Sequence, residues 1–228
     1  MPGAAVRALL HEAAEATAPA ASARLPVRVL DEAIGLAVND DLLAPALGFR
    51  IVELDRPAAA TLYAGGWRLE APRLLPERGE LTALACGVAT IGARLEQQVS
   101  ALFAERRGSL ALALDDLGNR CLYVLSRQLQ DRMMLAAEKR GLDIAGELRP
   151  GDPGLALDVQ EAVLQLAQGD SIGVTVTPGL LLHPLKSISV VFGAGHDLPP
   201  ARWSRCDDCR SRPTCRIAAR NAEFLARA

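Results

Sequence analysis

Apolar residues in this sequence gather in short runs bounded by glycine and proline. Runs of this kind that are rich in β-branched side chains predict strands, because such side chains fit a pleated and buried surface. The predicted strands cover residues 49–54, 61–64, 81–90, 143–148, 172–177, 180–182 and 187–192. The strands are grouped rather than strictly alternating with helices, which favours an α+β fold with a mostly antiparallel twisted sheet and packed helices.

A second pattern, in which apolar residues recur every three or four positions, predicts helices. It covers residues 93–105 and a longer segment that starts near Leu110. The apolar positions of the longer helix form one stripe: Leu110, Leu114, Leu117, Cys121, Val124 or Leu125, Leu129, Met133 and Ala136. We expect Cys121 to pack there as a small hydrophobic side chain. A shorter helix over 156–168 follows the loop 149–154, where glycine and proline exclude helix.

Composition divides the chain into three segments. Residues 1–26 combine an amphipathic helix with an alanine-rich linker, and we expect the helix to be loosely attached because the linker lacks large apolar side chains. Residues 27–200 hold the folded domain, and residues 201–228 form a tail rich in cysteine and arginine. Half of the 228 residues are hydrophobic, which is enough for a substantial core.

Charge and hydropathy narrow the classes of partner. The formal net charge is −2, with acidic and basic residues interspersed, so no basic surface for nucleic acid is expected. The most hydrophobic stretch, 172–194, is interrupted by two prolines, a histidine and a lysine, and no window of about 18 apolar residues suits a bilayer. The N-terminus has no cationic start and no continuous apolar run. We therefore expect a cytoplasmic protein with neither nucleic acid nor membrane as a partner.

Three cysteines near the C-terminus form the sharpest chemical motif. Cys206, Cys209 and Cys215 lie within ten residues, and a Cys-x-x-Cys turn brings two thiolates close enough to share a metal. Arginines between 202 and 216 would stabilise thiolates and an anionic cluster. An iron–sulfur cluster or a zinc site is the first interpretation, and a redox dithiol or plain reduced cysteines are the alternatives. Cys86, His196 or an exogenous group are the candidates for a fourth ligand.

Common catalytic signatures are absent from the sequence. It has no phosphate-binding loop with Lys-Ser/Thr, no Gly-x-Gly-x-x-Gly between a strand and a helix, no Gly-x-Ser-x-Gly and no His-Glu-x-x-His. The three histidines are far apart in the sequence, and nothing supports a Ser/His/Asp triad.

Several stretches resemble the activation domain of cobalamin-dependent methionine synthase and its free-standing relatives. The sequences PGDPGLALDVQ (150–160) and SIGVTVTPGLLLHPLKSIS (171–189) are similar to that family's loop, helix, Ile-Gly-Val strand and final Pro-x-Lys-Ser-Val-Ser segment. LACGVATIGARLE (84–96) and LALDDLG (112–118) resemble the same family. The resemblance spans roughly residues 45–217 and supports the α+β fold class.

The resemblance implies binding of S-adenosylmethionine and docking on a cobalamin-bearing partner. The family's nucleotide loop has the pattern Arg-x-x-x-Gly-Tyr. Here Gly151 is the loop glycine, Asp152 stands where the tyrosine is expected, and Glu147 rather than an arginine precedes Pro150 by three residues. Arg149 is adjacent to the proline instead. Because of these departures, the family's ligand contacts do not transfer directly.

Five residues are candidates for contact with the nucleotide. Arg149 can pair with a carboxylate in a bidentate manner, and Gly151 lets the backbone approach a ligand, with Asp152 beside it. The alternative is a Pro/Gly turn that needs no ligand. Asp115 either lies near the adenosylmethionine cleft or caps the long helix, and Lys186 contacts a ligand or partner unless it is simply solvated.

The resemblance therefore predicts an accessory protein for reductive activation of a separate cobalamin-dependent methyltransferase, such as a split methionine synthase. One α/β barrel alone takes about 250 residues, so we expect partners to supply the barrels and the cobalamin-binding domain, with an electron donor as a further partner. Two alternatives stay open. One is a non-catalytic module that binds a corrinoid protein or tetrapyrrole, and the other is an independent iron–sulfur redox protein.

Overall fold

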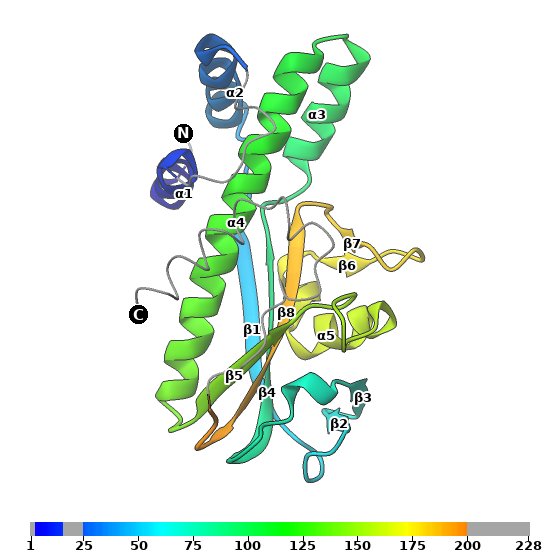
Figure 1. The fold of residues 1–228 in the computed structure, drawn as a ribbon. Coiled ribbons are helices and arrows are strands. Elements are labelled where there is room, and N and C mark those ends of the chain that lie inside the picture. The colour runs from blue at the N-terminus through cyan, green and yellow to red at the C-terminus, as the bar shows by residue number, and fades with distance from the viewer. Residues whose placement is uncertain (1–2, 16–24, 200–228) are drawn as a thin grey trace.

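A four-stranded antiparallel sheet forms the centre of the molecule (Figure 1). The computed structural model describes residues 3–15 and 25–199. The strands lie in the order β1-β4-β8-β5, and every neighbouring pair is antiparallel. Their bounds are β1 Ala46–Glu53, β4 Glu80–Thr90, β8 Ser187–His196 and β5 Asp143–Leu148. The predicted α+β class with an antiparallel sheet is confirmed.

One face of the sheet is covered by α4, Gly108–Glu138, which is the long helix predicted from the apolar stripe. The stripe side chains from Leu110 to Met133 are buried in the core between α4 and the sheet. The helices α2, Val27–Asn39, and α3, Arg94–Ala104, pack against α4. Among the residues that the structure describes, no helix is both long and apolar enough to cross a membrane.

Smaller elements cover the opposite face of the sheet (Figure 1). They are α5, two short hairpins and three short 3-10 helices. Their bounds are α5 Gln160–Leu166, β2 Thr61–Ala64, β3 Trp67–Glu70, β6 Thr175–Val176, β7 Leu182–His183, η2 Pro72–Leu74, η3 Leu157–Val159 and η4 Gly169–Ile172. The sheet has a hydrophobic core on each face. Successive side chains of β4 pack alternately in the core beside α4 and in the core on the opposite face, because a strand directs alternate side chains to opposite faces.

The predicted strand over 172–177 is wrong for most of its length. Ile172 ends the 3-10 helix η4, and only two residues of the run, in β6, form a strand. Gln168 and Gly173 flank η4 in the left-handed region, with φ of 58° and 73°, so the chain bends where the β-branched run suggested extension. The strand predicted over 180–182 is displaced to β7. Helix α2 and strand β3 were not predicted.

The N-terminal helix α1, Ala4–Glu15, is not loosely attached as expected. Val6, Leu9, Leu10 and Ala13 are buried in the core that contains α4, and they follow the helical spacing of one apolar face. Gln128 of α4 also donates a hydrogen bond from Nε2 to Glu12 Oε2 at 3.1 Å. The helix is therefore part of the folded body. The three-segment division of the chain stays a prediction, since most of the linker and all of 201–228 lie outside the described residues.

Two free cysteines occupy opposite cores. Cys121 lies in the α4 stripe, and Cys86 projects from β4 to the other side of the sheet. Both side chains are fully buried. Burial disfavours the thiolate and raises the pKa of each thiol from 9.0 to about 12.

We expect both thiols to resist iodoacetamide in the folded protein at pH 8 and to react fully in urea, as measured by mass spectrometry on a chain with Cys206, Cys209 and Cys215 changed to serine.

Between pH 9 and 12 the unfolded thiols ionise while the folded ones stay protonated. Stability should therefore fall as pH rises through this window and be unaffected by these groups below it. Changing Cys86 and Cys121 to alanine should flatten the alkaline loss; rapid labelling of the native protein at pH 8 would contradict the burial.

Candidate functional site

Two of the predicted site residues meet on the surface of α4. Lys186 Nζ lies 2.7 Å from Asp115 Oδ1 and donates a hydrogen bond to Asn119 Oδ1 at 2.6 Å. Asn119 in turn donates from Nδ2 to Asp115 Oδ2 at 3.1 Å. We call these three residues the lysine cluster. The Lys186 side chain is only 13% exposed, so it is held in place rather than solvated.

The segment before β8 is fixed against the helices and the sheet around it. The Leu185 N–H donates to Glu96 Oε2 of α3 at 2.8 Å, and the Lys186 carbonyl accepts from the Ile91 N–H at 3.1 Å. The Ser187 and Thr90 hydroxyls are hydrogen-bonded at 2.8 Å. Lys186 is therefore placed by three elements that are distant in the sequence.

The adjacent acidic residue has a different environment. Asp116 is nearly buried and accepts a hydrogen bond at 2.9 Å from Arg120 Nε, one helical turn later. Because α4 begins at Gly108, neither Asp115 nor Asp116 caps the helix, so the capping alternative for Asp115 is wrong. Asn119 was not predicted, although its i+4 spacing from Asp115 is the signal that could have found it.

The loop after β5 is closed by its own groups. Asp152 Oδ2 accepts the Arg149 N–H at 2.9 Å, and the Asp152 N–H donates to the Arg149 carbonyl at 2.8 Å. The Gly151 N–H donates to the Leu155 carbonyl at 2.9 Å. Gly151 has a φ of 92°, which L side chains rarely adopt, so the loop requires glycine there. Asp152 thus shapes the turn from the position that the family pattern gives to tyrosine.

The Arg149 side chain turns toward Glu147. Arg149 Nη2 lies 3.0 Å from Glu147 Oε1, and Gln130 Nε2 of α4 donates to the same oxygen at 3.4 Å. The two charged side chains are 25% and 30% exposed. We call Gln130, Glu147 and Arg149 the Glu147 network. It joins the end of β5 to α4.

The lysine cluster and the Glu147 network both involve α4. Asn119 and Gln130 are eleven residues apart, which corresponds to about 16 Å along an α-helix. At the sheet, β8 starts beside the lysine cluster and pairs with the end of β5 through Val191 and Leu148. The five predicted ligand residues thus fall into two separate groups. Asp115 and Lys186 lie in the lysine cluster, and Arg149, Gly151 and Asp152 lie in the loop after β5.

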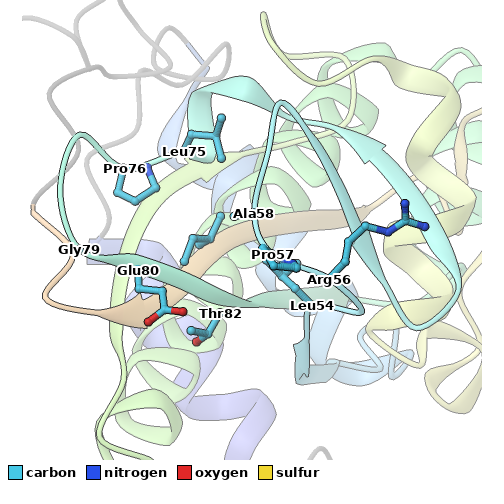
Figure 2. A pocket seen from close by; sticks show the side chains of 10 residues that line it. Leu54, Arg56, Pro57, Ala58, Leu75, Pro76, Gly79, Glu80 and Thr82 are labelled. Atoms are coloured by element: carbon cyan, nitrogen blue, oxygen red, sulfur yellow. The ribbon is translucent and has the colours of Figure 1, made fainter.

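A separate hollow of about 600 Å³ lies at the other end of the sheet (Figure 2). It is lined by the β1–β2 connection, the chain between η2 and β4, and the first residues of β4: Leu54, Arg56, Pro57, Ala58, Leu75, Pro76, Gly79, Glu80, Leu81 and Thr82. Its walls are largely apolar, and the Arg56 guanidinium stacks 3.6 Å from the centre of the Tyr63 ring. No sequence motif indicated this hollow.

The predicted metal ligands Cys206, Cys209 and Cys215 lie outside the described residues. Within residues 3–15 and 25–199, no group of three or more His, Cys, Asp or Glu side chains could hold a metal ion. Of the candidate fourth ligands, Cys86 is sealed in the core, whereas His196 is exposed at the end of β8. Of these two side chains, only that of His196 is open to solvent.

Comparison with known proteins identifies the fold. No protein-family model matches the sequence, and no curated protein matches it. Among solved structures, the MetH reactivation domain bound to AdoHcy matches 88% of this chain and 76% of its own, with a TM-score of 0.59 and 12% sequence identity. The chain has the fold of the MetH reactivation domain.

The reactivation-domain fold confirms what the sequence motifs suggested about architecture. At 12% identity the match supports the fold but not the roles of individual side chains. The departures from the family's nucleotide loop, Asp152 and Glu147, therefore have to be judged from their own contacts. Those contacts show a loop that is already hydrogen-bonded internally.

Proposed function

We propose that this protein serves a methionine synthase-type activation system, in which it binds S-adenosylmethionine and acts on a separate cobalamin-dependent methyltransferase. The supporting observation is the likeness of 88% of the chain to a reactivation domain that was solved with AdoHcy. The proposal includes a cytoplasmic setting, where free thiols such as Cys86 and Cys121 persist.

The lysine cluster and the loop after β5 are together the proposed nucleoside site. Adenosylmethionine and its thioether product carry polar groups at both ends, and each group of residues is proposed to meet one end. The lysine cluster presents an ammonium, a carboxylate and an amide, which suit ribose hydroxyls and ring nitrogens. At the other end, Gly151 has no side chain to keep a ligand from the backbone, and its own N–H already donates to the Leu155 carbonyl.

The chemistry of the proposed reaction is divided between this chain and its partners. Cobalamin, held by the methyltransferase and not by this chain, would supply a reducible cobalt as the acceptor of the methyl group, and AdoHcy would be the other product. The residues of this chain hold the nucleoside and present its methyl group. We also propose that Cys206, Cys209 and Cys215 bind an iron–sulfur cluster or a zinc ion. An iron–sulfur cluster would relay electrons.

Nucleoside binding tests the proposal directly. Calorimetry with AdoHcy is expected to show binding to the wild type, weakened about tenfold by Lys186→Met, which corresponds to the loss of one charge-assisted hydrogen bond. Lys139→Met is the matched control, because Lys139 is exposed at the far end of α4 and should leave affinity unchanged. If the two substitutions change the affinity for AdoHcy equally, the lysine cluster is not part of the nucleoside site.

Methyl transfer provides the second arm of the test. The protein would be mixed with a Co(II) cobalamin methyltransferase, a reductant and adenosylmethionine, and the visible spectrum followed. We expect conversion to the methylated form only when this protein is present. No acceleration over the protein-free control would argue against the helper role.

One observation favours the non-catalytic alternative, a module that binds a corrinoid protein. The backbone of the loop at 149–152 is hydrogen-bonded internally, in part through Asp152, as a turn without a ligand would be. Retained binding to the methyltransferase together with no affinity for AdoHcy or adenosylmethionine would support this function over the first.

A further inference from the structure

The hollow at the end of the sheet has an apolar floor that is continuous with the core. Leu54, Ala58 and Leu75 line the hollow and also pack against the core on this face of the sheet. Its volume of about 600 Å³ falls within the range of about 300–1,000 Å³ for pockets that hold small ligands, so an aromatic side chain would fit. Figure 2 shows Arg56 extending away from the other lining side chains, toward the ring of Tyr63 on which it stacks. Covering the apolar floor would be favourable.

The described chain ends beside this hollow. His196, the last residue of β8, pairs with Glu80, which lines the hollow. A Cβ on Gly79, another lining residue, would overlap the carbonyl oxygens of His196 and Asp197, so the backbone after β8 lies directly against the wall. Leu198 is partly buried against the core on the same face. The chain is therefore fixed at the edge of the hollow as far as Leu198.

The residues that follow in the sequence supply a matching side chain. Trp203 is the first large apolar residue after Leu198, and five extended residues span at most about 18 Å. A short connection of this kind gives a side chain an effective concentration of the order of millimolar, so a site of only millimolar affinity is substantially occupied. Arg202 and Arg205 flank Trp203, and their charge is opposite to that of Glu80 at the hollow.

We infer that the indole of Trp203 docks in this hollow and fastens the C-terminal segment to the end of the sheet. Pro57 and Pro76 form part of the walls and restrict the backbone there, so the hollow needs little ordering before it is filled. Docking would hold Cys206, three residues later, at the end of β8 that carries His196. The inference is independent of the proposed function, because it concerns a contact within this chain.

Tryptophan fluorescence tests the inference, because the sequence has two tryptophans, Trp67 and Trp203. With the exposed Trp67 of β3 changed to phenylalanine, the emission of the full chain reports Trp203 alone. Ala58→Phe is designed to fill the hollow. Ala59→Phe is the matched control, because Ala59 is exposed and does not line the hollow. All of these proteins should have the same far-ultraviolet circular dichroism.

We expect Trp203 to emit at a shorter wavelength in the native protein than in urea and to be weakly quenched by iodide, because docking removes the indole from water. Ala58→Phe should shift the emission to its position in urea and raise the quenching to the level of the unfolded chain. Ala59→Phe should change neither. The wavelength is the primary readout, since a metal bound by the nearby cysteines would lower the intensity.

Dye binding provides a second arm that does not depend on the Ala58→Phe protein. Trp203→Ala should open the hollow to Nile red, an uncharged apolar dye, and raise the dye's fluorescence above that of the wild type. Phe224→Ala removes the other aromatic residue of the segment 200–228 and should leave the dye's fluorescence unchanged. Equal Nile red fluorescence in the wild type and Trp203→Ala would contradict the docking.

Three fluorescence results would overturn the inference. The first is an emission wavelength of Trp203 that is the same in the native protein and in urea. The second is a shifted emission that Ala58→Phe leaves unchanged, which would place the indole somewhere other than the hollow. The third is a shift that grows with protein concentration, which would mean that a second copy of the chain covers Trp203.

Discussion

Replacing Gly195 with alanine is expected to lower the free energy of unfolding by about 3 kcal/mol or more, above the usual range for overpacking. A Cβ at this position would lie 1.9 Å from the Glu80 carbonyl oxygen and 3.0 Å from Leu81 Cα. Both atoms belong to the backbone of β4, so no side chain can move aside. The β4–β8 register also shifts beside this point, between Leu81 and Ala83. Urea unfolding followed by circular dichroism measures the loss.

Gly35→Ala is the matched control for this prediction. A Cβ at Gly35, in α2, would meet nothing within 4 Å. Alanine in a helix loses less backbone entropy on folding than glycine, so this variant should gain about 0.5–1 kcal/mol. A Gly195→Ala protein as stable as the wild type would mean that β4 and β8 are farther apart than the structure shows.

Leu129→Ala is expected to cost about 2–5 kcal/mol, the usual range for a leucine truncated in a closed core. Leu129 is fully buried where α4 crosses β4, and its methyl groups lie 3.1 and 3.2 Å from the position of a Cβ on Gly87. The glycine lets the helix approach the sheet, and the leucine fills the space above it. Thermal and urea denaturation would both report the change.

Leu135→Ala on the same helix provides the control. Leu135 is 56% exposed, so its truncation should stay within about 0.5 kcal/mol of the wild type. If the two leucine variants lose similar stability, then α4 is not seated on the sheet by the face that carries Leu129.

Much of the architecture was predictable because it depends on local periodicity. Strand β5 and the hairpin strand β2 have the predicted bounds, and the α4 stripe is buried as expected. Helix α2 was missed although its apolar side chains recur at helical spacing and pack in the core: Val29, Leu30, Ala33, Leu36 and Ala37. The strand prediction over 172–177 was wrong because the chain bends at Gln168 and Gly173, whose backbone is left-handed, despite the β propensity of the run.

The site was predictable in composition but not in pairing. Asp115 and Lys186 were both candidates, yet nothing in a single sequence links residues 71 positions apart, and their contact follows from the tertiary fold. The internal roles of Glu147 and Asp152 depend on hydrogen-bond geometry at the end of β5, which residue types alone do not specify. The hollow at the other end of the sheet had no signal in the sequence, because loop residues and the start of β4 line it without forming a motif.

The pairing of β4 with β8 has a consequence for how the protein is made. Thr90 and Ser187, hydrogen-bonded across this pair, are separated by 97 positions, so the centre of the sheet closes a long stretch of chain. Closing such a stretch is entropically unfavourable and is typical of slow-folding topologies. On the ribosome β4 emerges long before its partner, and its open edge is exposed to other chains in the interval. The nascent chain therefore completes the central sheet only after β8, which ends at His196, has been synthesised.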